Sequence, residues 1–582
     1  MIRMISAATS ASDDFFKIRT ASVKPVAAKQ KSLFRRILEV LTYQERRRFY
    51  FLAFLDVIIS LVDILSIALL LCIIQFYVQP SQSRLSEFLP AWLTNRNSIA
   101  LIAVFFFLFA AKNILAFIIT GVQNKFTSGI AVRISEHNLK AFQHGTFEQF
   151  INSDSSVHIR KIALQPFEFC QYLLAGVQQI ITQTALIIIS IIAILIFNAG
   201  LFFLILLILL PPVIGIFFFI KRRLSNDKLQ IKYSNQMSFQ YLMDALKGYV
   251  EANIYDRNGF FLQRFIGYRK KYSSHLFDSI TIQTLPGRLV EIFAVMGLFI
   301  LIVIANWSGV NDGNAFITIG AFMAAAYKII PGIVKMVNTA SQIKAHEFSL
   351  MDIAPVQNAK RNKEENDQKK IHSIEFSNVS FQYHGSPVIN NLSFTAKCGD
   401  FVGIEGMSGK GKTTILNMLL GFLSPCGGTV KFNDDIQFGD GIKKFWPSIS
   451  YVRQQSYFIH DTILRNIILE DVCDEQRLQH ALSATGLSDL VQSFPEGIEK
   501  LIAENGKNIS GGQQQRISLA RALYKNADVI LLDEPFNELD EASEKILLQF
   551  LKQLADDGKI IVMITHNKHA FSFCNKVVTL NE

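Results

Sequence analysis

The chain has 582 residues, enough for three or four domains, and half of its residues are hydrophobic. Its mean hydropathy of +0.28 is too apolar for an ordinary soluble enzyme and predicts segments that span a membrane. The net charge of +10 then indicates the cytoplasmic surplus of Lys and Arg typical of membrane proteins, and we expect no nucleic-acid partner.

The first half of the chain predicts a short tail and a membrane domain. Residues 1–33 lack hydrophobic periodicity and predict a flexible cytoplasmic tail; an organelle transit peptide is the alternative, against which Asp13 and Asp14 count. Phe34–Arg48 is basic and amphipathic, which predicts a helix at the membrane surface. Residues 34–354 are predicted to form an all-α polytopic membrane domain with six transmembrane helices. The six apolar stretches lie near 49–79, 98–122, 172–198, 200–220, 286–307 and 315–338.

The loops predict the orientation of these stretches. Lys and Arg crowd the N-terminus and the segment after the fourth stretch, whereas Ser308–Asn314 has neither. By the positive-inside rule both termini lie in the cytoplasm, and we expect a multi-pass protein of a bacterial inner membrane. The inner connections 123–171 and 221–285 are long and apolar, and we expect helices that extend the spans. Their tips, near Gly145–Phe147 and Lys247–Asp256, are predicted to contact the domain formed by the second half of the chain.

Charged residues inside the apolar stretches have two interpretations. Asp56 and Asp63 lie seven residues apart and share one face of the first helix, and Lys112 lies in the second. Arg288 and Glu291 are three residues apart at the start of the fifth. Such groups are costly in hydrocarbon, so they either line a translocation cavity or form structural pairs such as Arg288 with Glu291.

The second half of the chain predicts a nucleotide-binding domain. Residues 355–370 are polar and rich in charge, which predicts a linker, and residues 371–582 suit one α/β P-loop NTPase domain. The run Gly406–Thr413 follows an apolar strand and fits G-x-x-x-x-G-K-[ST], whose glycines let backbone N–H groups surround phosphate oxygens. The predicted nucleotide-binding residues here are Gly406, Met407, Ser408, Gly409, Lys410, Gly411, Lys412, Thr413 and Thr414.

Within this loop, Lys412 is expected to reach the terminal phosphates, and the Thr413 hydroxyl is expected to bind Mg2+. Four more motifs follow in a fixed order. They are Gln454 after a short strand, the run Ser510, Gly511, Gly512 and Gln513 at a helix start, the pair Asp533 and Glu534 at the end of an apolar strand, and His566 after the next strand. A Ser-Gly-Gly run at a helix start offers a second anion-binding site.

Together these motifs resemble the ATP-binding cassette (ABC) family, and the six spans with long cytoplasmic extensions resemble its exporter half-transporters. The resemblance implies that Tyr383 stacks on adenine and that Gln454 contacts Mg2+. It further implies that Asp533 holds the metal and that Glu534 is the general base for the attacking water. His566 matches the switch histidine, which contacts the γ-phosphate.

The resemblance also implies a dimer, because in this family the signature of one domain closes over ATP on the phosphate loop of another. Here Ser510–Gln513 is the signature, and a homodimer with two competent sites is expected, with a heterodimer as the alternative. Three residues depart from the family pattern. Lys410 and Glu538 stand where small residues are usual, and Arg453 stands where proline is usual. The sequence alone does not predict how these three residues affect ATP binding or hydrolysis.

The function that follows is ATP hydrolysis coupled to export or flipping of a cargo by alternating access. The first span and Leu285–Glu291 resemble flippases of lipid-linked oligosaccharides, so an amphipathic or glycolipid cargo is expected. Multidrug, lipid or peptide export is the alternative. A further alternative, of another class, is an ATP-gated channel or a regulatory ABC protein; the presence of both Glu534 and His566 counts against it, because a gate needs no turnover.

Overall fold

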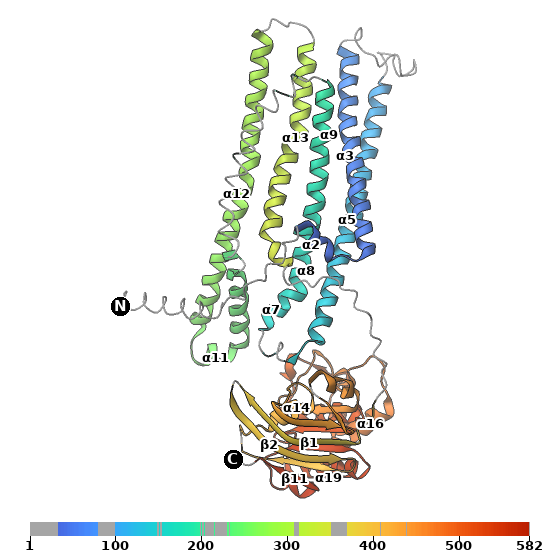
Figure 1. Cartoon of the computed structure of the whole chain (residues 1–582), viewed down its shortest axis with the longest axis vertical. Coiled ribbons are helices and arrows are strands. Elements are labelled where there is room, and N and C mark those ends of the chain that lie inside the picture. Colours follow the sequence, from blue (N-terminus) through green and yellow to red (C-terminus); the bar gives the residue numbers. More distant parts are fainter. Residues whose placement is uncertain are drawn as a thin grey trace, which may run out of the picture. The chain divides into compact units, whose positions relative to one another are not determined.

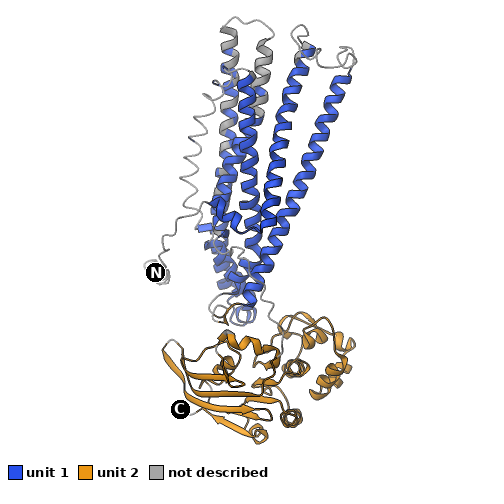
Figure 2. Cartoon of the chain, turned by 45° about the vertical axis from the view of Figure 1, so that its right-hand side comes forward, with its two compact units in different colours: residues 1–144, 153–360 blue, residues 145–152, 361–582 orange. Residues whose placement is uncertain are grey.

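The computed structural model describes residues 33–78, 99–147, 154–197, 233–307, 314–350 and 369–580, except 384, 408 and 438, and also the single residues 151, 200, 203, 215, 230 and 231. The chain divides into two compact units, Met1–His144 with Ser153–Lys360 and Gly145–Asn152 with Arg361–Glu582 (Figure 2). The predicted tail, the fourth predicted span and the predicted linker lie wholly or largely outside the described residues.

The described part of the first unit is helical, and its long helices α3, α5, α9, α12 and α13 run side by side (Figure 1). The elements are α2 Leu33–Glu39, α3 Tyr43–Val78, α5 Ala100–Gln143, α7 Ser155–Ile159, η2 Arg160–Leu164, α8 Gln165–Glu168, η3 Phe169–Leu174, α9 Ala175–Phe197, α11 Tyr249–Ile254, α12 Asn258–Trp307, α13 Asn314–Ala345 and η4 Glu347–Leu350. The two π-helical stretches η2 and η3 flank α8, where Pro166 lacks the N–H that a regular α-helix needs.

Helix lengths agree with spans that continue beyond a bilayer. The 44 residues of α5 and the 50 residues of α12 correspond to about 66 and 75 Å, against a hydrocarbon core of ~30 Å. Among the described residues, three helical segments are long and apolar enough to cross a membrane, judged by length and composition: Tyr43–Ile74, Ala100–Gln143 and Ser155–Ile196. The fifth and sixth predicted spans lie within α12 and α13.

The prediction of a single helix over 34–48 is wrong, because the helix is interrupted between the end of α2 at Glu39 and the start of α3 at Tyr43. A capping box starts α3: the Thr42 N–H donates to the Glu45 carboxylate at 2.8 Å, and the Glu45 N–H donates to the Thr42 hydroxyl at 3.3 Å. Ile37 and Leu41 are buried in one cluster with Phe49. The apolar face of α2 therefore packs against protein.

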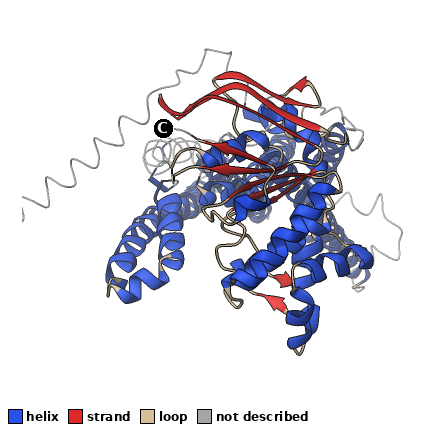
Figure 3. Ribbon diagram, turned by 90° about the horizontal axis from the view of Figure 1, so that it is seen from below, coloured by secondary structure: helices blue, strands red, loops and turns tan. Residues whose placement is uncertain are grey.

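The described residues of the second unit form three sheets (Figure 3). A four-stranded antiparallel sheet has the order β2-β1-β4-β5, a five-stranded parallel sheet has the order β11-β3-β10-β9-β6, and β7 pairs with β8. The strands are β1 Ser373–Tyr383, β2 Ser386–Lys397, β3 Phe401–Glu405, β4 Gly427–Phe432, β5 Asp435–Ile436, β6 Ile449–Val452, β7 Asp461–Thr462, β8 Leu501–Ile502, β9 Val529–Asp533, β10 Ile560–Ile564 and β11 Lys576–Thr579.

Helices cover both faces of the parallel sheet. They are α14 Lys412–Leu419, α15 Ile463–Ile468, α16 Glu475–Ala484, α17 Leu487–Ser493, α18 Gly511–Tyr524 and α19 Glu541–Asp556, with 3-10 turns at Gly439–Ser448, Gly497–Glu499, Glu504–Gly506 and Ala570–Phe573. Every residue of β9 and β10 is buried, and successive residues face opposite sides. Leu531 packs in a cluster with α14, whereas Ile530 and Leu532 pack in another with α18 and α19.

Candidate nucleotide-binding and catalytic site

Four neighbouring strands of the parallel sheet bring the predicted site residues to one edge. β3 leads into the Gly406 loop, β10 into His566, β9 ends at Asp533, and β6 ends just before Gln454. Because the carboxyl ends of parallel strands share an edge, residues far apart in the sequence meet there. The order β3-β10-β9-β6 thus explains why the motifs converge.

The phosphate loop has the backbone that its glycines permit. Gly409 and Gly411 have φ of +82° and +89°, which glycine adopts without strain. A Cβ at Gly411 would lie 2.8 Å from Val388 of β2, so the loop also packs too closely there for a side chain. α14 begins directly afterwards, and its N-terminus offers a partial positive charge. Ser408 lies outside the described residues, Met407 is exposed, and Thr414 is buried.

Lys412 folds back into its own loop. Its ammonium donates to the Gly406 carbonyl oxygen at 2.6 Å and lies 2.9 Å from Nε2 of His566. Burial lowers the pKa of Lys412, and the negative charges of Glu534 and Asp533 oppose that shift. The ammonium therefore has protein partners that phosphate oxygens can replace.

Two side-chain amides hold the Glu534 carboxylate, and His566 lies beside it. Gln454 and Asn537 each donate a side-chain N–H to Oε2 at 2.7 Å, and Nε2 of His566 lies 3.2 Å from Oε1. The Glu534 backbone has a φ of +50°, in the left-handed region that few residues other than glycine adopt. Strain of this kind persists where surrounding contacts determine the conformation, and it often marks functional sites.

Asp533 is buried beside the phosphate loop. The Thr413 hydroxyl donates to Asp533 Oδ2 at 3.4 Å, and the Tyr451 hydroxyl donates to the same oxygen at 3.5 Å. Burial, and the negative charge of Glu534 next to it, raise the pKa of Asp533. Burial, with the charge of Asp533, also raises the pKa of Tyr451 to about 12, so its hydroxyl stays a donor at neutral pH.

The donor set at this position fits Mg2+. The ion prefers hard oxygen ligands and usually takes one or two carboxylates together with phosphate oxygens. Thr413 and Asp533 supply a hydroxyl and a carboxylate that already contact each other. Gln454 directs its amide N–H to Glu534, which leaves the amide oxygen for the ion or its water.

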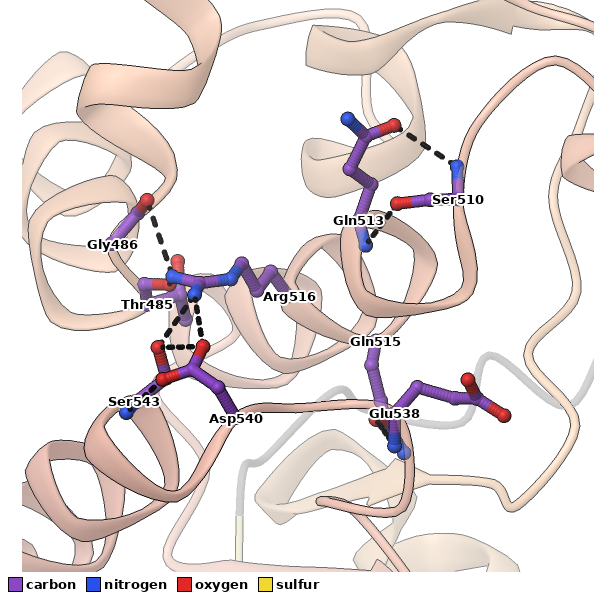
Figure 4. A network of polar contacts seen from close by, with 9 residues as sticks. All are labelled: Thr485, Gly486, Ser510, Gln513, Gln515, Arg516, Glu538, Asp540 and Ser543. Carbon is purple, nitrogen blue, oxygen red and sulfur yellow. Dashed lines mark hydrogen bonds and ion pairs between the residues drawn. The ribbon is translucent and has the colours of Figure 1, made fainter.

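The signature run lies at the start of α18 (Figure 4). Ser510 caps this helix: its N–H donates to the Gln513 side chain at 3.0 Å, and the Gln513 N–H donates to the Ser510 hydroxyl at 3.4 Å. A Cβ at Gly511 would lie 2.9 Å from Oε2 of Glu538, and one at Gly512 would lie 2.8 Å from the Glu538 carbonyl oxygen. Among the described residues, no hydrogen bond or ion pair joins Ser510–Gln513 to the phosphate loop.

Three contributors to the site were not predicted from the sequence. Gln515 is 7% exposed, accepts from the Glu538 N–H at 2.8 Å and donates to the Glu534 carbonyl at 3.2 Å. Asn537 orients Glu534, and Tyr451 contacts Asp533. In the sequence, these residues stood out only by lying near motif residues: Gln515 follows Gln513 by two positions, Asn537 follows Glu534 by three, and Tyr451 precedes Gln454 by three. Their partners depend on tertiary packing.

Tyr383 lies at the end of β1, where it pairs with Ser386 and is 44% exposed. Its ring meets Phe381 edge-on at 4.9 Å. The β1–β2 hairpin lies beside the phosphate loop, since Val388 approaches Gly411. An exposed aromatic ring on that hairpin agrees with the predicted stacking on a base.

Charged residues of the membrane helices make polar pairs. Asp63 of α3 forms ion pairs with Lys112 of α5 and with Lys328 of α13, the latter at 3.0 Å. Arg288 and Glu291 pair at 3.4 Å, as the structural interpretation predicts. The Asp56 carboxylate accepts hydrogen bonds from Gln123, Gln178 and Thr182. Asp56 and Asp63 therefore join α3 to three other helices.

The predicted contact at the first hairpin tip is confirmed. Residues 145–152 belong to the second unit, and the Phe147 ring stacks on Phe422 with centroids 4.4 Å apart. The Lys443 ammonium donates to the Gly145 carbonyl at 3.4 Å. At the second tip, Tyr249 and Ile254 of α11 are 71% and 74% exposed, and their contact with a nucleotide-binding domain stays a prediction.

Comparisons with known proteins agree with this geometry. Residues 389–537 match the family model described as ABC transporter. Relatives include a "Probable ABC transporter ATP-binding/permease protein" of Haemophilus influenzae, 27% identical, with 58% of this chain and 62% of that protein covered. An "ATP-dependent lipid A-core flippase" of Burkholderia pseudomallei is 26% identical, with 62% of this chain and 61% of that protein covered. The chain thus spans about three fifths of the length of these relatives.

One solved structure covers nearly the whole chain. A structure entitled "Structure of a bacterial Atm1-family ABC exporter with ATP bound" aligns with a TM-score of 0.72 and 16% identity over 92% of this chain and 93% of that one. The second unit therefore contains an ABC transporter domain, and the chain as a whole has the fold of an ABC exporter.

Proposed function

We propose that two copies of this chain form an ATP-driven exporter or flippase, with ATP hydrolysed at two composite sites. The observation that carries the proposal is the Glu534 carboxylate, which accepts hydrogen bonds from Gln454 and Asn537 and lies beside His566 in an ABC transporter domain. A positioned carboxylate of this kind can take a proton from an attacking water. The helical unit on the same chain, which has the fold of an exporter, would use this hydrolysis for transport.

In this mechanism the residues of the chain act in a defined order. ATP phosphates replace the Gly406 carbonyl and His566 as partners of Lys412. Release from Lys412 leaves His566 free to contact the terminal phosphate while Glu534 stays oriented by its two amide donors. Mg2+ held by Thr413 and Asp533 would neutralise phosphate charge. Closure of the two domains over ATP then shifts the helices between inward- and outward-facing states.

Two observations support a dimer and its coupling. The signature has no polar contact with its own phosphate loop among the described residues, so a second copy can supply the missing half of each site. The exposed apolar side chains of α11, Tyr249 and Ile254, also call for a protein partner. Phe147, which stacks on Phe422, would carry motion from the cassette into α5.

The cargo we propose is an amphipathic lipid or glycolipid, because relatives of this chain are named as flippases of lipid A-core. The membrane of residence would be a bacterial inner membrane with both termini in the cytoplasm. Export of drugs or peptides is the alternative within the same class. An ATP-gated channel is the alternative outside it.

The test uses the full chain in liposomes. Glu534→Gln keeps an oxygen for Gln454 and Asn537 but removes the base, and we expect hydrolysis to fall about 10²–10⁴-fold. Asp557→Asn, an equal loss of charge at the exposed end of α19, is the control and should hydrolyse ATP normally. Hydrolysis that survives Glu534→Gln would show that another group is the base. Passive ion flux without ATP-dependent movement of fluorescent glycolipid would favour the channel.

A further inference from the structure

Two charged residues near the proposed site depart from the pattern of the resembled family. Lys410 lies in the phosphate loop and Glu538 lies four residues after Glu534, and both stand where the resembled family has small residues. Neither forms an ion pair with any residue in the part of the chain that the structure describes. An unpaired lysine adds positive charge beside the phosphates, whereas an unpaired glutamate beside the signature adds negative charge.

Glu538 is fixed in place although its side chain is exposed. Its N–H donates to the buried Gln515 side chain at 2.8 Å, which anchors the backbone to α18. Its side chain lies against the signature, with Oε2 2.9 Å and Cγ 3.1 Å from where a Gly511 Cβ would be. Figure 4 shows Glu538 beside Gln515 of α18. The carboxylate therefore sits on the surface that closes over ATP.

We propose that Glu538 of one copy pairs with Lys410 of the other copy across the composite ATP site. The inference rests on the proposed function, because only the sandwich dimer brings a signature over a second phosphate loop. In that dimer each Glu538, packed on its own Gly511, faces the loop that carries the other copy's Lys410. Two equivalent pairs form, and each cancels a charge that would otherwise disturb phosphate binding.

The chemistry of the closed site makes the pair selective for a second copy of this chain. Without Lys410 opposite, the Glu538 carboxylate would repel the terminal phosphate that approaches the start of α18. A partner subunit with a small residue at the position of Lys410 would not offset the repulsion between Glu538 and the phosphate. The pair thus favours self-association over mixed dimers, as complementary charges do at other interfaces.

The decisive experiment is charge exchange in the full chain, with ATP hydrolysis in liposomes as the readout. Glu538→Lys and Lys410→Glu should each lower kcat/KM at least about tenfold, the lower range for close interfacial charge pairs. The double variant should recover to within about threefold of wild type. Asp557→Asn is the control for loss of one carboxylate and should leave hydrolysis unchanged.

A second measurement does not depend on activity. In a chain whose six native cysteines are replaced by serine, Lys410→Cys with Glu538→Cys should form a disulfide-linked dimer when Mg-ATP and the Glu534→Gln change trap closure. Lys410→Cys with Asp557→Cys should not. If the wild type hydrolyses ATP but the double variant does not recover and no cross-link forms, the pairing is overturned and the proposed function is not. Faster hydrolysis in Glu538→Gln would instead identify Glu538 as an inhibitory anion. Inactive wild type would overturn the proposed function itself.

Discussion

The two glycines at the start of α18 should respond differently to alanine. A Cβ at Gly511 would lie 2.9 Å from Oε2 of Glu538, the far end of a flexible side chain that can rotate away. A Cβ at Gly512 would lie 2.8 Å from the Glu538 carbonyl oxygen, which belongs to a backbone anchored by Gln515. Gly512→Ala must therefore move backbone, whereas Gly511→Ala need move only a side chain.

The magnitudes follow from this difference. Forcing extra atoms into a packed site costs about 1–3 kcal/mol, and for a domain of this size each kcal/mol lowers the melting temperature by roughly 2–4 °C. Gly512→Ala should therefore lower the apparent melting temperature of the nucleotide-free full chain by about 2–12 °C. Gly511→Ala should lower it by less than about 2 °C, because alanine also favours the helix.

Glu538→Ala provides the control for this comparison. It removes every Glu538 atom near Gly511 but keeps the carbonyl oxygen near Gly512. In that background Gly511→Ala should be neutral or stabilising, and Gly512→Ala should remain costly. Differential scanning fluorimetry of the purified protein measures both. Equal losses for the two alanines, or rescue of Gly512→Ala by Glu538→Ala, would show that the packing is different.

Three further changes test other parts of the structure. Asp533→Asn should raise the melting temperature of the nucleotide-free protein at pH 7. The pKa of Asp533 is raised in the folded protein, so its negative charge costs stability at pH values above its ordinary pKa near 3.8. The gain in melting temperature should vanish below pH 3.8, and Mg-dependent hydrolysis should be lost. Asp63→Asn should lower the free energy of unfolding, measured in urea, by more than ~1 kcal/mol. The loss should stay below the ~3–5 kcal/mol of a fully buried ion pair, because the Asp63 side chain is 20% exposed. Phe147→Ala should keep hydrolysis within about threefold and lower glycolipid flipping at least about tenfold, because a stacked, half-buried aromatic pair joins the hairpin to the cassette.

Each of these has an outcome that contradicts it. A nucleotide-free Asp533→Asn protein less stable than wild type would mean that the carboxylate has a stabilising partner. A loss of stability below ~1 kcal/mol for Asp63→Asn would reduce its ion pairs to the level of exposed ones. Normal flipping by Phe147→Ala would remove the first hairpin tip from the coupling path.

Local pattern predicted much of the cassette. The buried strands β9 and β10 are apolar runs followed by Asp533 and His566, so the motifs could be assigned to strand ends before their positions were known. The parallel order of the sheet then placed them together. The break at Thr42 was missed although Thr-x-x-Glu is a readable cap, because the basic amphipathic pattern runs on through it.

Long-range partners could not be predicted in the same way. Asp63 and Lys328 are 265 positions apart, and sequence showed only that a charge in a span needs some partner. Gln515 is one of three consecutive glutamines, and nothing local distinguishes it from Gln514. Its role depends on β9 and α18 packing together in the tertiary fold.

In the proposed dimer, the contacts of Gln515 would connect the two composite ATP sites. Its amide oxygen accepts from the Glu538 N–H and its amide N–H donates to the Glu534 backbone carbonyl, so one buried side chain of α18 holds the backbone at both Glu538 and Glu534. A shift of α18 on closing must carry Glu534 with it or leave a buried amide unpaired, which costs about 1–3 kcal/mol. In the proposed dimer, closure at the signature of one site would therefore be linked within each copy to the orientation of Glu534 in the other site. That link would give the two proposed sites a physical reason to respond to each other.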